Sequence, residues 1–177
     1  KEQLAQGKEN HYCEETGVDA RDNSNDILPW YIKLNVVKQE ITDDQKAKVS
    51  EALGGEGEVF ILKDIHFINT KDGSEWQPTK PVKIKIPMVD IGDYENAIIV
   101  HITDDGKIEL IKGTVKDGMI EFEADSFSLY GIAGTNTSIN DLLVVEDDGA
   151  VVWPWIVIAI IALAAIVYLV YRRKREA

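Results

Sequence analysis

The sequence has 177 residues, enough for one ordinary domain with flanking segments. Its formal net charge is −12, and a strongly acidic chain is repelled by nucleic-acid phosphates, so we exclude nucleic acid as a partner. Cys13 is the single cysteine, which excludes an intrachain disulfide and the small disulfide-rich class of secreted domains.

Residues 1–26 are polar and show no periodic pattern, so we interpret them as a linker or as the end of an upstream domain. His11 and Cys13 are two residues apart, but no second pair of ligands completes a zinc site, and we expect no metal there. The chain starts at Lys1 without a Met or an export signal. We therefore expect it to be the C-terminal part of a longer exported protein.

The first β-prone stretch covers residues 28–36. Its apolar side chains recur at every second position, namely at Leu28, Trp30, Ile32, Leu34 and Val36. Period-two spacing predicts a half-buried strand.

A short helix is predicted next, at about residues 43–53. Thr42 and Gln45 have the spacing of a capping box, and Asp43 and Asp44 suit the positive end of a helix dipole. We interpret these two aspartates as part of the helix start rather than as metal ligands. The glycine pair at 54–55 ends the helix.

Six further β-prone stretches follow, and together with the first they give about seven or eight strands. They cover residues 59–68, 82–88, 97–102, 108–111, 119–123 and 127–133. Asp-Gly pairs at 105–106 and 117–118 predict hairpin turns. This pattern predicts a mainly β fold, an immunoglobulin-like β-sandwich over residues 27–134 with one short helix. A Cys–Trp–Cys signature is absent from the sequence, so we expect sandwich architecture rather than a true immunoglobulin domain.

The C-terminal part of the sequence predicts a membrane anchor. Residues 135–150 read as an acidic juxtamembrane spacer. Residues 151–171 contain no charged side chain, and as a helix they would be about 31 Å long, which matches the hydrocarbon core of a bilayer. A helix satisfies its own backbone polar groups in lipid, so we predict a single C-terminal transmembrane α-helix.

The residues flanking this span indicate its orientation. Aromatic side chains of the kind found at membrane interfaces lie near both ends, and a basic cluster follows: Trp153, Trp155, Tyr168, Tyr171, Arg172, Arg173, Lys174 and Arg175. Basic residues favour the cytoplasmic side. We therefore expect a single-pass protein of the cell membrane, with residues 172–177 as a cytoplasmic tail, the N-terminal portion extracellular, and membrane lipid as a partner.

A search for catalytic patterns finds none to which chemistry can be assigned. His66 and His101 lie in predicted strands without an identifiable acid or nucleophile, so we interpret them as core or edge histidines. Glu121 and Glu123 share one face of a strand, as paired glycosidase carboxylates do, but they alternate with apolar residues and indicate a solvated outer face. We predict no catalytic, cofactor-binding or metal-binding residue, no cofactor, and no enzymatic activity.

Two stretches carry a resemblance to a known group of proteins. One is residues 76–87, WQPTKPVKIKIP, and the other runs from Tyr94 to Tyr130 and ends in Ser-Phe-Ser-Leu-Tyr. Together they resemble a β-sandwich module of Gram-positive (Firmicutes) cell-surface proteins, many of them adhesin-like. The resemblance implies an extracellular stalk or adhesive role. Related domains form Lys–Asn isopeptide bonds, for which Lys83 or Lys85 with Asn96 would be the residues, but we do not predict one.

The sequence departs from that group where the group carries its sortase motif, Leu-Pro-x-Thr-Gly. The only Leu-Pro pair is Leu28-Pro29, in the first predicted strand. We therefore expect a retained membrane helix instead of covalent attachment to the cell wall.

Two functional hypotheses follow. The first is a non-catalytic, membrane-anchored extracellular module of a bacterial surface protein, which acts as a stalk or anchor for upstream domains that bind extracellular protein or glycan. The alternative is the anchor and accessory domain of an exported enzyme whose catalytic domain lies upstream of residue 1. A signalling receptor is disfavoured, because the basic tail after residue 171 has only six residues.

Overall fold

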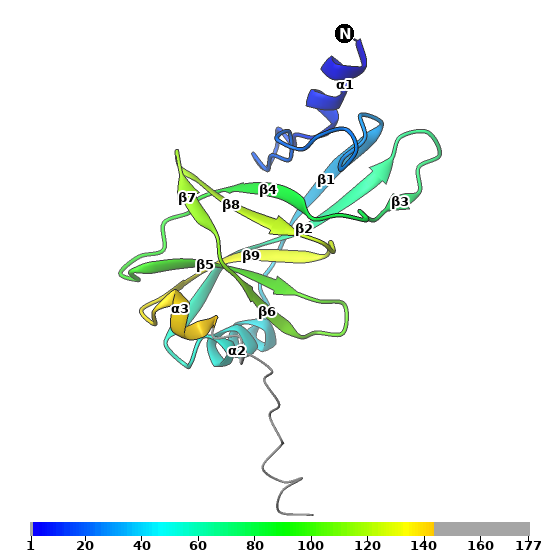
Figure 1. Cartoon of the computed structure of the whole chain (residues 1–177). Helices are drawn as coiled ribbons and strands as arrows, with labels where there is room; N and C mark the ends of the chain where they lie inside the picture. Colours follow the sequence, from blue (N-terminus) through cyan, green and yellow to red (C-terminus); the bar gives the residue numbers. More distant parts are fainter. Residues whose placement is uncertain (1, 144–177) are drawn as a thin grey trace, which may run out of the picture. The chain divides into compact units, whose positions relative to one another are not determined.

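Two antiparallel sheets form the core of residues 2–143, the part of the chain that the computed structural model describes (Figure 1). In the larger sheet the strand order is β1 (Ile32–Gln39), β2 (Gly57–Asn69), β9 (Leu129–Thr135), β5 (Asn96–Ile102) and β6 (Ile108–Ile111), and β3 (Glu75–Trp76) pairs with β2 off this path. The smaller sheet has the order β4 (Val82–Pro87), β8 (Met119–Ala124) and β7 (Thr114–Lys116). The predicted mainly β class with few helices is confirmed.

The described residues form three helices: α1 (Glu2–Asn10), α2 (Asp43–Ala52) and α3 (Ile139–Leu142). The capping box predicted at α2 is confirmed. The Gln45 backbone N–H donates to Thr42 Oγ1 over 3.2 Å, and the Thr42 backbone N–H donates to Gln45 Oε1 over 2.9 Å. The side chains of Thr42 and Gln45 thus accept hydrogen bonds from two backbone N–H groups at the start of α2 that have no partner within the helix.

Apolar side chains from both sheets form one core cluster. Ile84, Ile86 and Phe122 of the smaller sheet belong to the same buried cluster as Ile65 and Tyr130 of the larger sheet. In β4 these buried residues alternate with Lys83 and Lys85, as period-two spacing predicts. The two sheets are thus held together by burial of their facing apolar sides.

A second core cluster covers the other face of the larger sheet. Val49 and Leu53 of the α2 region pack there with Leu62, Ile98 and Val100. Residues 98–100 are therefore buried on both faces of the sheet, which explains why β5 reads as a continuous apolar run rather than as an alternating one.

The first predicted strand begins later than the sequence pattern indicates. Residues 28–31 form turns, in which the Ile32 N–H donates to the Pro29 carbonyl, and β1 starts only at Ile32. Leu28 is fully buried as predicted, but from a turn. The prediction of a strand at 28–31 is therefore wrong, because apolar spacing alone does not distinguish a turn that buries one side chain from a strand.

The hairpin turn predicted at residues 117–118 is confirmed between β7 and β8. Asp117 has a φ of 51° and Gly118 a φ of 73°. A type I′ turn needs positive φ at both central residues, and Asp-Gly supplies them at low steric cost. The turn sets the register in which Lys116 lies opposite Met119.

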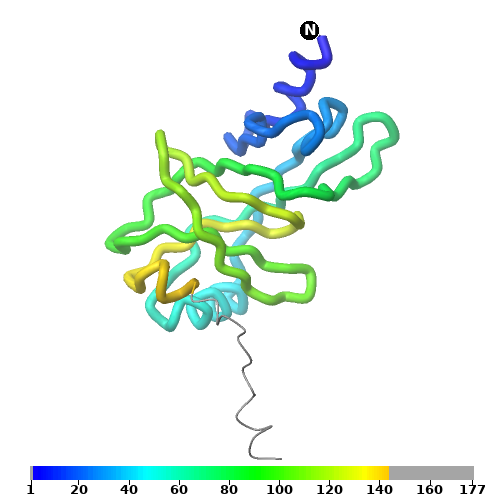
Figure 2. Tube along the Cα trace, in the orientation of Figure 1, coloured from blue at the N-terminus to red at the C-terminus, as the bar shows by residue number. Residues whose placement is uncertain are grey.

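The two ends of the described segment lie far apart. Figures 1 and 2 show α1 at one end of this compact unit, and α2 and α3 at the opposite end. Residues 135–143, which the sequence assigns to a spacer, include the last residue of β9 and helix α3, and Ile139 and Leu142 pack against the core on the α2 side. Between residues 2 and 143 no helix is long and apolar enough to cross a membrane.

Candidate functional site

The anchor residues predicted from the sequence lie outside the described residues, as do the span 151–171 and the tail 172–177. These anchor residues are Trp153, Trp155, Tyr168, Tyr171, Arg172, Arg173, Lys174 and Arg175. The candidate site within the described unit is the junction between its N-terminal segment, residues 2–31, and the edge of the smaller sheet. This junction includes the N-terminal end of the described unit.

Backbone hydrogen bonds attach the N-terminal segment to β4. The Asp19 N–H donates to the Lys85 carbonyl over 2.9 Å, and the Lys85 N–H donates to the Asp19 carbonyl over 2.8 Å. Because β4 is an edge strand of the smaller sheet, these bonds satisfy backbone groups on its free edge. Val18 and Ala20, on either side of this contact, are buried in the core.

The Asn23 side chain attaches the N-terminal segment to β4 at a second residue, Lys83. Its side-chain Nδ2 donates to the Lys83 carbonyl over 2.8 Å, and its Oδ1 accepts from the Lys83 N–H over 2.9 Å. An asparagine amide presents one donor and one acceptor, which is the pattern of a backbone peptide group. We call the contacts of Asp19 and Asn23 with β4 the N-terminal clamp.

Charged side chains surround the clamp. Lys85 pairs with Asp22 and with Glu121, the latter over 3.6 Å, and Lys83 Nζ lies 3.6 Å from Glu121 Oε1. A hydrogen bond with Asp22 raises the pKa of Lys85. Burial by itself would raise the pKa of Asp19, but its hydrogen bonds with Arg21, 2.6 Å at Nη2, hold that pKa below the ordinary value.

Glu121 and Glu123 lie on the outer face of β8, as predicted, because Ile120 and Phe122, which alternate with them, are buried. The lysine–asparagine pair that the resemblance implies is not in contact. Lys83 and Lys85 reach carboxylates beside the clamp, whereas Asn96 donates to the Thr137 carbonyl over 3.3 Å from the larger sheet.

Helix α1 packs on the turns that precede β1. Asn10 Nδ2 donates to the Trp30 carbonyl over 2.8 Å, and His11 Nε2 lies 3.0 Å from the Pro29 carbonyl oxygen. A Cβ atom on Gly7 would lie 3.3 Å from Trp30 Cβ, so only glycine allows this close approach without adjustment. Burial lowers the pKa of His11. The sequence interpretation of residues 1–26 is a linker or the end of an upstream domain. The structure places residues 2–26 in the same compact unit as the sheets.

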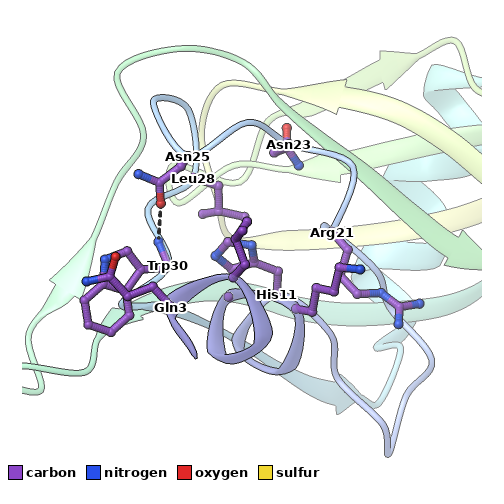
Figure 3. A pocket seen from close by; sticks show the side chains of 10 residues that line it. Gln3, His11, Arg21, Asn23, Asn25, Leu28 and Trp30 are labelled. Atoms are coloured by element: carbon purple, nitrogen blue, oxygen red, sulfur yellow. Dashed lines mark hydrogen bonds between the residues drawn. The ribbon is translucent and has the colours of Figure 1, made fainter. Parts of the chain in front are cut away.

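A pocket of about 320 Å³ lies beside α1 (Figure 3). Its lining residues are Gln3, Leu4, Gly7, Lys8, His11, Arg21, Asn23, Asn25, Leu28 and Trp30. The Trp30 N–H donates to Asn25 Oδ1 over 2.9 Å at its rim, and His11 and Asn23 already have protein partners. In the described range no group of three or more His, Cys, Asp or Glu residues is placed to hold a metal ion.

His101 has the acid and hydroxyl partners that the sequence pattern did not reveal. Its Nδ1 lies 2.8 Å from Glu109 Oε2, its Nε2 lies 2.9 Å from Ser128 Oγ, and its ring stacks on Tyr130 with centroids 4.3 Å apart. The β5–β6 register places His101 opposite Glu109, and the β5–β9 register places it opposite Tyr130. The loop between β5 and β6 has three residues, 104–106, closed by the Thr103 N–H donating to the Lys107 carbonyl, whereas a two-residue turn at 105–106 would have placed Leu110 opposite His101.

The order carboxylate, imidazole, hydroxyl is also that of serine hydrolases. Here, however, Ser128 Oγ donates to the Ile102 carbonyl over 3.0 Å. That bond uses the single Ser128 hydroxyl proton, so the proton is not directed at His101 Nε2. We therefore interpret the His101 cluster as a polar connection between β5, β6 and the loop before β9. His66 is a partly exposed histidine that contacts Asn35 of the neighbouring strand over 2.7 Å, consistent with the predicted edge or core role.

Comparison with known proteins gives no family. No protein-family model matches the chain, and no curated protein matches it.

Proposed function

We propose that this chain is a non-catalytic, membrane-anchored extracellular module of a bacterial surface protein, acting as a stalk that holds upstream binding domains away from the membrane. The observation that carries the proposal is the placement of α1 and α3 at opposite ends of the described unit. A module that joins two parts in series adds its own length only if the chain enters at one end and leaves at the other.

The apolar stretch at residues 151–171 supports the anchoring half of the proposal. It follows the exit end of the described unit within eight residues and is long enough to span a bilayer. The basic cluster after it favours a cytoplasmic C-terminus, which leaves the N-terminal portion extracellular. In this arrangement residues 151–171 contact membrane lipid, and upstream domains make any contact with extracellular protein or glycan.

The finer fold assignment is an immunoglobulin-like β-sandwich. The shared core between the sheets supports it, and so does Tyr130, whose hydroxyl donates to the Ser126 carbonyl over 2.6 Å. A tyrosine whose hydroxyl bonds to the backbone a few residues upstream, near the start of a strand, is the tyrosine corner of immunoglobulin-like sandwiches. The resemblance to Gram-positive surface modules includes this same segment, residues 126–130.

The N-terminal clamp is suited to carry a load. Force that arrives through α1 acts on residues 11–26, which are joined to β4 by the backbone bonds of Asp19 and the side-chain bonds of Asn23. Those bonds must break before the N-terminal segment separates from the sheet. An attached entry segment therefore keeps an upstream domain at a fixed distance from the core of the stalk.

The test is membrane extraction of the full chain produced behind an export signal. We expect the protein to remain in the membrane pellet after alkaline carbonate, and protease added outside intact spheroplasts to remove residues 1–150 while the basic tail is protected. The double variant Ile161→Lys/Leu163→Lys should move to the soluble fraction, because a lysine at the centre of a span costs about 3 kcal/mol.

The matched control is Ile161→Leu/Leu163→Ile, which keeps the span apolar and should stay in the pellet. Recovery of the unmodified chain in the soluble fraction, or protection of its N-terminal portion from external protease, would refute the proposal.

A further inference from the structure

Lys63 of β2 is a buried cationic side chain without a carboxylate partner among residues 2–143. The residue is 8 % exposed. Its Nζ donates to the Thr16 carbonyl over 2.9 Å, and no ion pair with an acidic residue is formed in the described part of the chain. A lysine ammonium has three N–H donors, so two of them are left for another acceptor.

The surroundings of Lys63 make this charge costly. The β1–β2 register places Lys38 directly opposite Lys63, and like charges in a cross-strand pair repel each other. Burial lowers the pKa of Lys63; the nearby Cys13 thiol opposes this shift, and Lys38 adds to it. An acceptor with a negative charge at Nζ would relieve both the lost solvation and the repulsion.

Lys63 lines a pocket of about 530 Å³ between the end of β1, the residues after β4 and the loop that contains Thr16. Thr16, which also lines the pocket, has a buried Oγ1 atom with no hydrogen-bond partner within the described residues. Apolar side chains form most of the remaining wall, among them Val36, Ile61 and Met88. Its charged lining consists of Lys38 and Lys63 against Glu15.

We propose that this pocket binds a small carboxylic acid with an apolar body. The carboxylate accepts hydrogen bonds from Lys63 Nζ and from the Thr16 hydroxyl, and the apolar body packs against Val36, Ile61 and Met88. A buried hydroxyl without a partner and an ammonium group with two N–H donors left over favour an acceptor at this place, and the apolar wall favours a singly charged acid over a strongly hydrated phosphate. The volume lies within the range of small-molecule sites. The proposal does not depend on the stalk function.

The test measures binding of 4-phenylbutyrate to the full chain in lipid nanodiscs by calorimetry, with empty nanodiscs as the blank for partition into lipid. The neutral isostere 4-phenylbutanol tests whether the carboxylate is recognised. We expect saturable binding of the acid that is at least tenfold tighter than binding of the alcohol. Lys63→Met, which keeps the length of the side chain and removes its charge, should weaken binding of the acid at least tenfold.

The matched control is Lys116→Met on the exposed strand β7, which should bind the acid like the unmodified chain. Thermal unfolding separates loss of binding from loss of the fold: Lys63→Met should melt at the same or a higher temperature, because it removes an unpaired buried charge. The proposal is overturned if the acid does not bind saturably, if the alcohol binds equally well, or if a folded Lys63→Met variant keeps its affinity for the acid.

Discussion

Asn23 and Lys83 are sixty residues apart in the sequence, yet both polar atoms of the Asn23 amide bond to the backbone of Lys83. The side chain thereby takes the place of a paired strand on the free edge of β4. Edge strands expose unpaired donors and acceptors that can pair with other chains, and this amide covers one such pair. The contact joins the N-terminal segment of the unit to its smaller sheet.

Replacing Asn23 with Leu should lower the free energy of unfolding by about 2 kcal/mol. The change removes three hydrogen bonds, two to the Lys83 backbone and one to the Ala20 carbonyl. It leaves the Lys83 backbone groups beside an apolar side chain, and each unsatisfied buried group costs about 1–3 kcal/mol. Chemical denaturation followed by tryptophan fluorescence measures the effect. Asn140→Leu, at an exposed position in α3, should change stability by less than about 0.5 kcal/mol. Equal stability of the two variants would contradict the clamp.

Replacing His101 with Phe should cost about 1–2 kcal/mol. The phenyl ring keeps the stack on Tyr130, but the contacts with Glu109 and Ser128 are lost. His66→Phe is the control, because His66 is partly exposed and its substitution should cost less. A variant as stable as the unmodified chain would show that the two polar contacts contribute nothing to the fold.

Ser128 should not react with a fluorophosphonate probe. Its hydroxyl donates to the Ile102 carbonyl, so His101 does not activate it as a nucleophile. Mass spectrometry of the probe-treated chain measures the labelling, with a serine hydrolase as the positive control. Stoichiometric labelling at Ser128 that disappears in His101→Phe would instead assign a catalytic role to the cluster.

Tyr130 should make the unit less stable at alkaline pH. Burial raises the pKa of Tyr130, although its hydrogen bond to Ser126 opposes the shift. Below the unfolded pKa of about 10 the phenol is neutral in both states and its contribution to stability is complete. At higher pH the unfolded state loses the proton first, so the free energy of unfolding falls by up to about 1.4 kcal/mol per pH unit.

Chemical denaturation between about pH 9 and pH 11 tests this prediction. Tyr130→Phe should show a shallower decline than the unmodified chain, since the variant has no proton to lose at this position. Tyr94→Phe, at a partly exposed position, serves as the control and should keep the original slope. Parallel declines for all three proteins would mean that Tyr130 does not link stability to pH.

Gly131→Ala should destabilise the larger sheet by more than about 2 kcal/mol. Gly131 lies in β9 between β2 and β5, and a Cβ there would lie 2.4 Å from the Ile61 carbonyl oxygen and 2.7 Å from Leu62 Cδ2. The backbone atom cannot move without breaking the ladder, so the added methyl group overpacks the sheet. Thermal unfolding measures the loss.

Gly118→Ala provides a contrast at the β7–β8 turn. Its φ is 73°, but no atom lies within 4 Å of the added Cβ, so only backbone strain remains and the cost should be about 1 kcal/mol. If Gly118→Ala lowered the stability more than Gly131→Ala, crowding in β9 would not be the reason for glycine at position 131.

The short-range features of this fold could be predicted from the sequence. The Thr42–Gln45 capping box and the Asp117-Gly118 turn depend on residues within four positions of one another. The alternation in β4 likewise reports the one face of that strand that is buried. Local chemistry determined these features. The cap and the turn depend on side chains and φ angles of neighbouring residues, and the alternation in β4 depends on which face of that one strand is buried.

The pairing of distant segments was decided only by the tertiary structure. In the sequence residues 11–26 resemble a linker, because the groups they bond to lie in β4. The sequence also gives no sign that Lys63 is buried, because its contact with the Thr16 carbonyl comes from a distant loop. His101 acquires Glu109 and Ser128 from strand register. The sequence by itself determined the mainly β class and predicted a membrane anchor at 151–171, because strand periodicity and an uncharged run are properties of single segments. Which polar groups meet depends on how sheets and loops pack, since their partners lie up to 79 residues away.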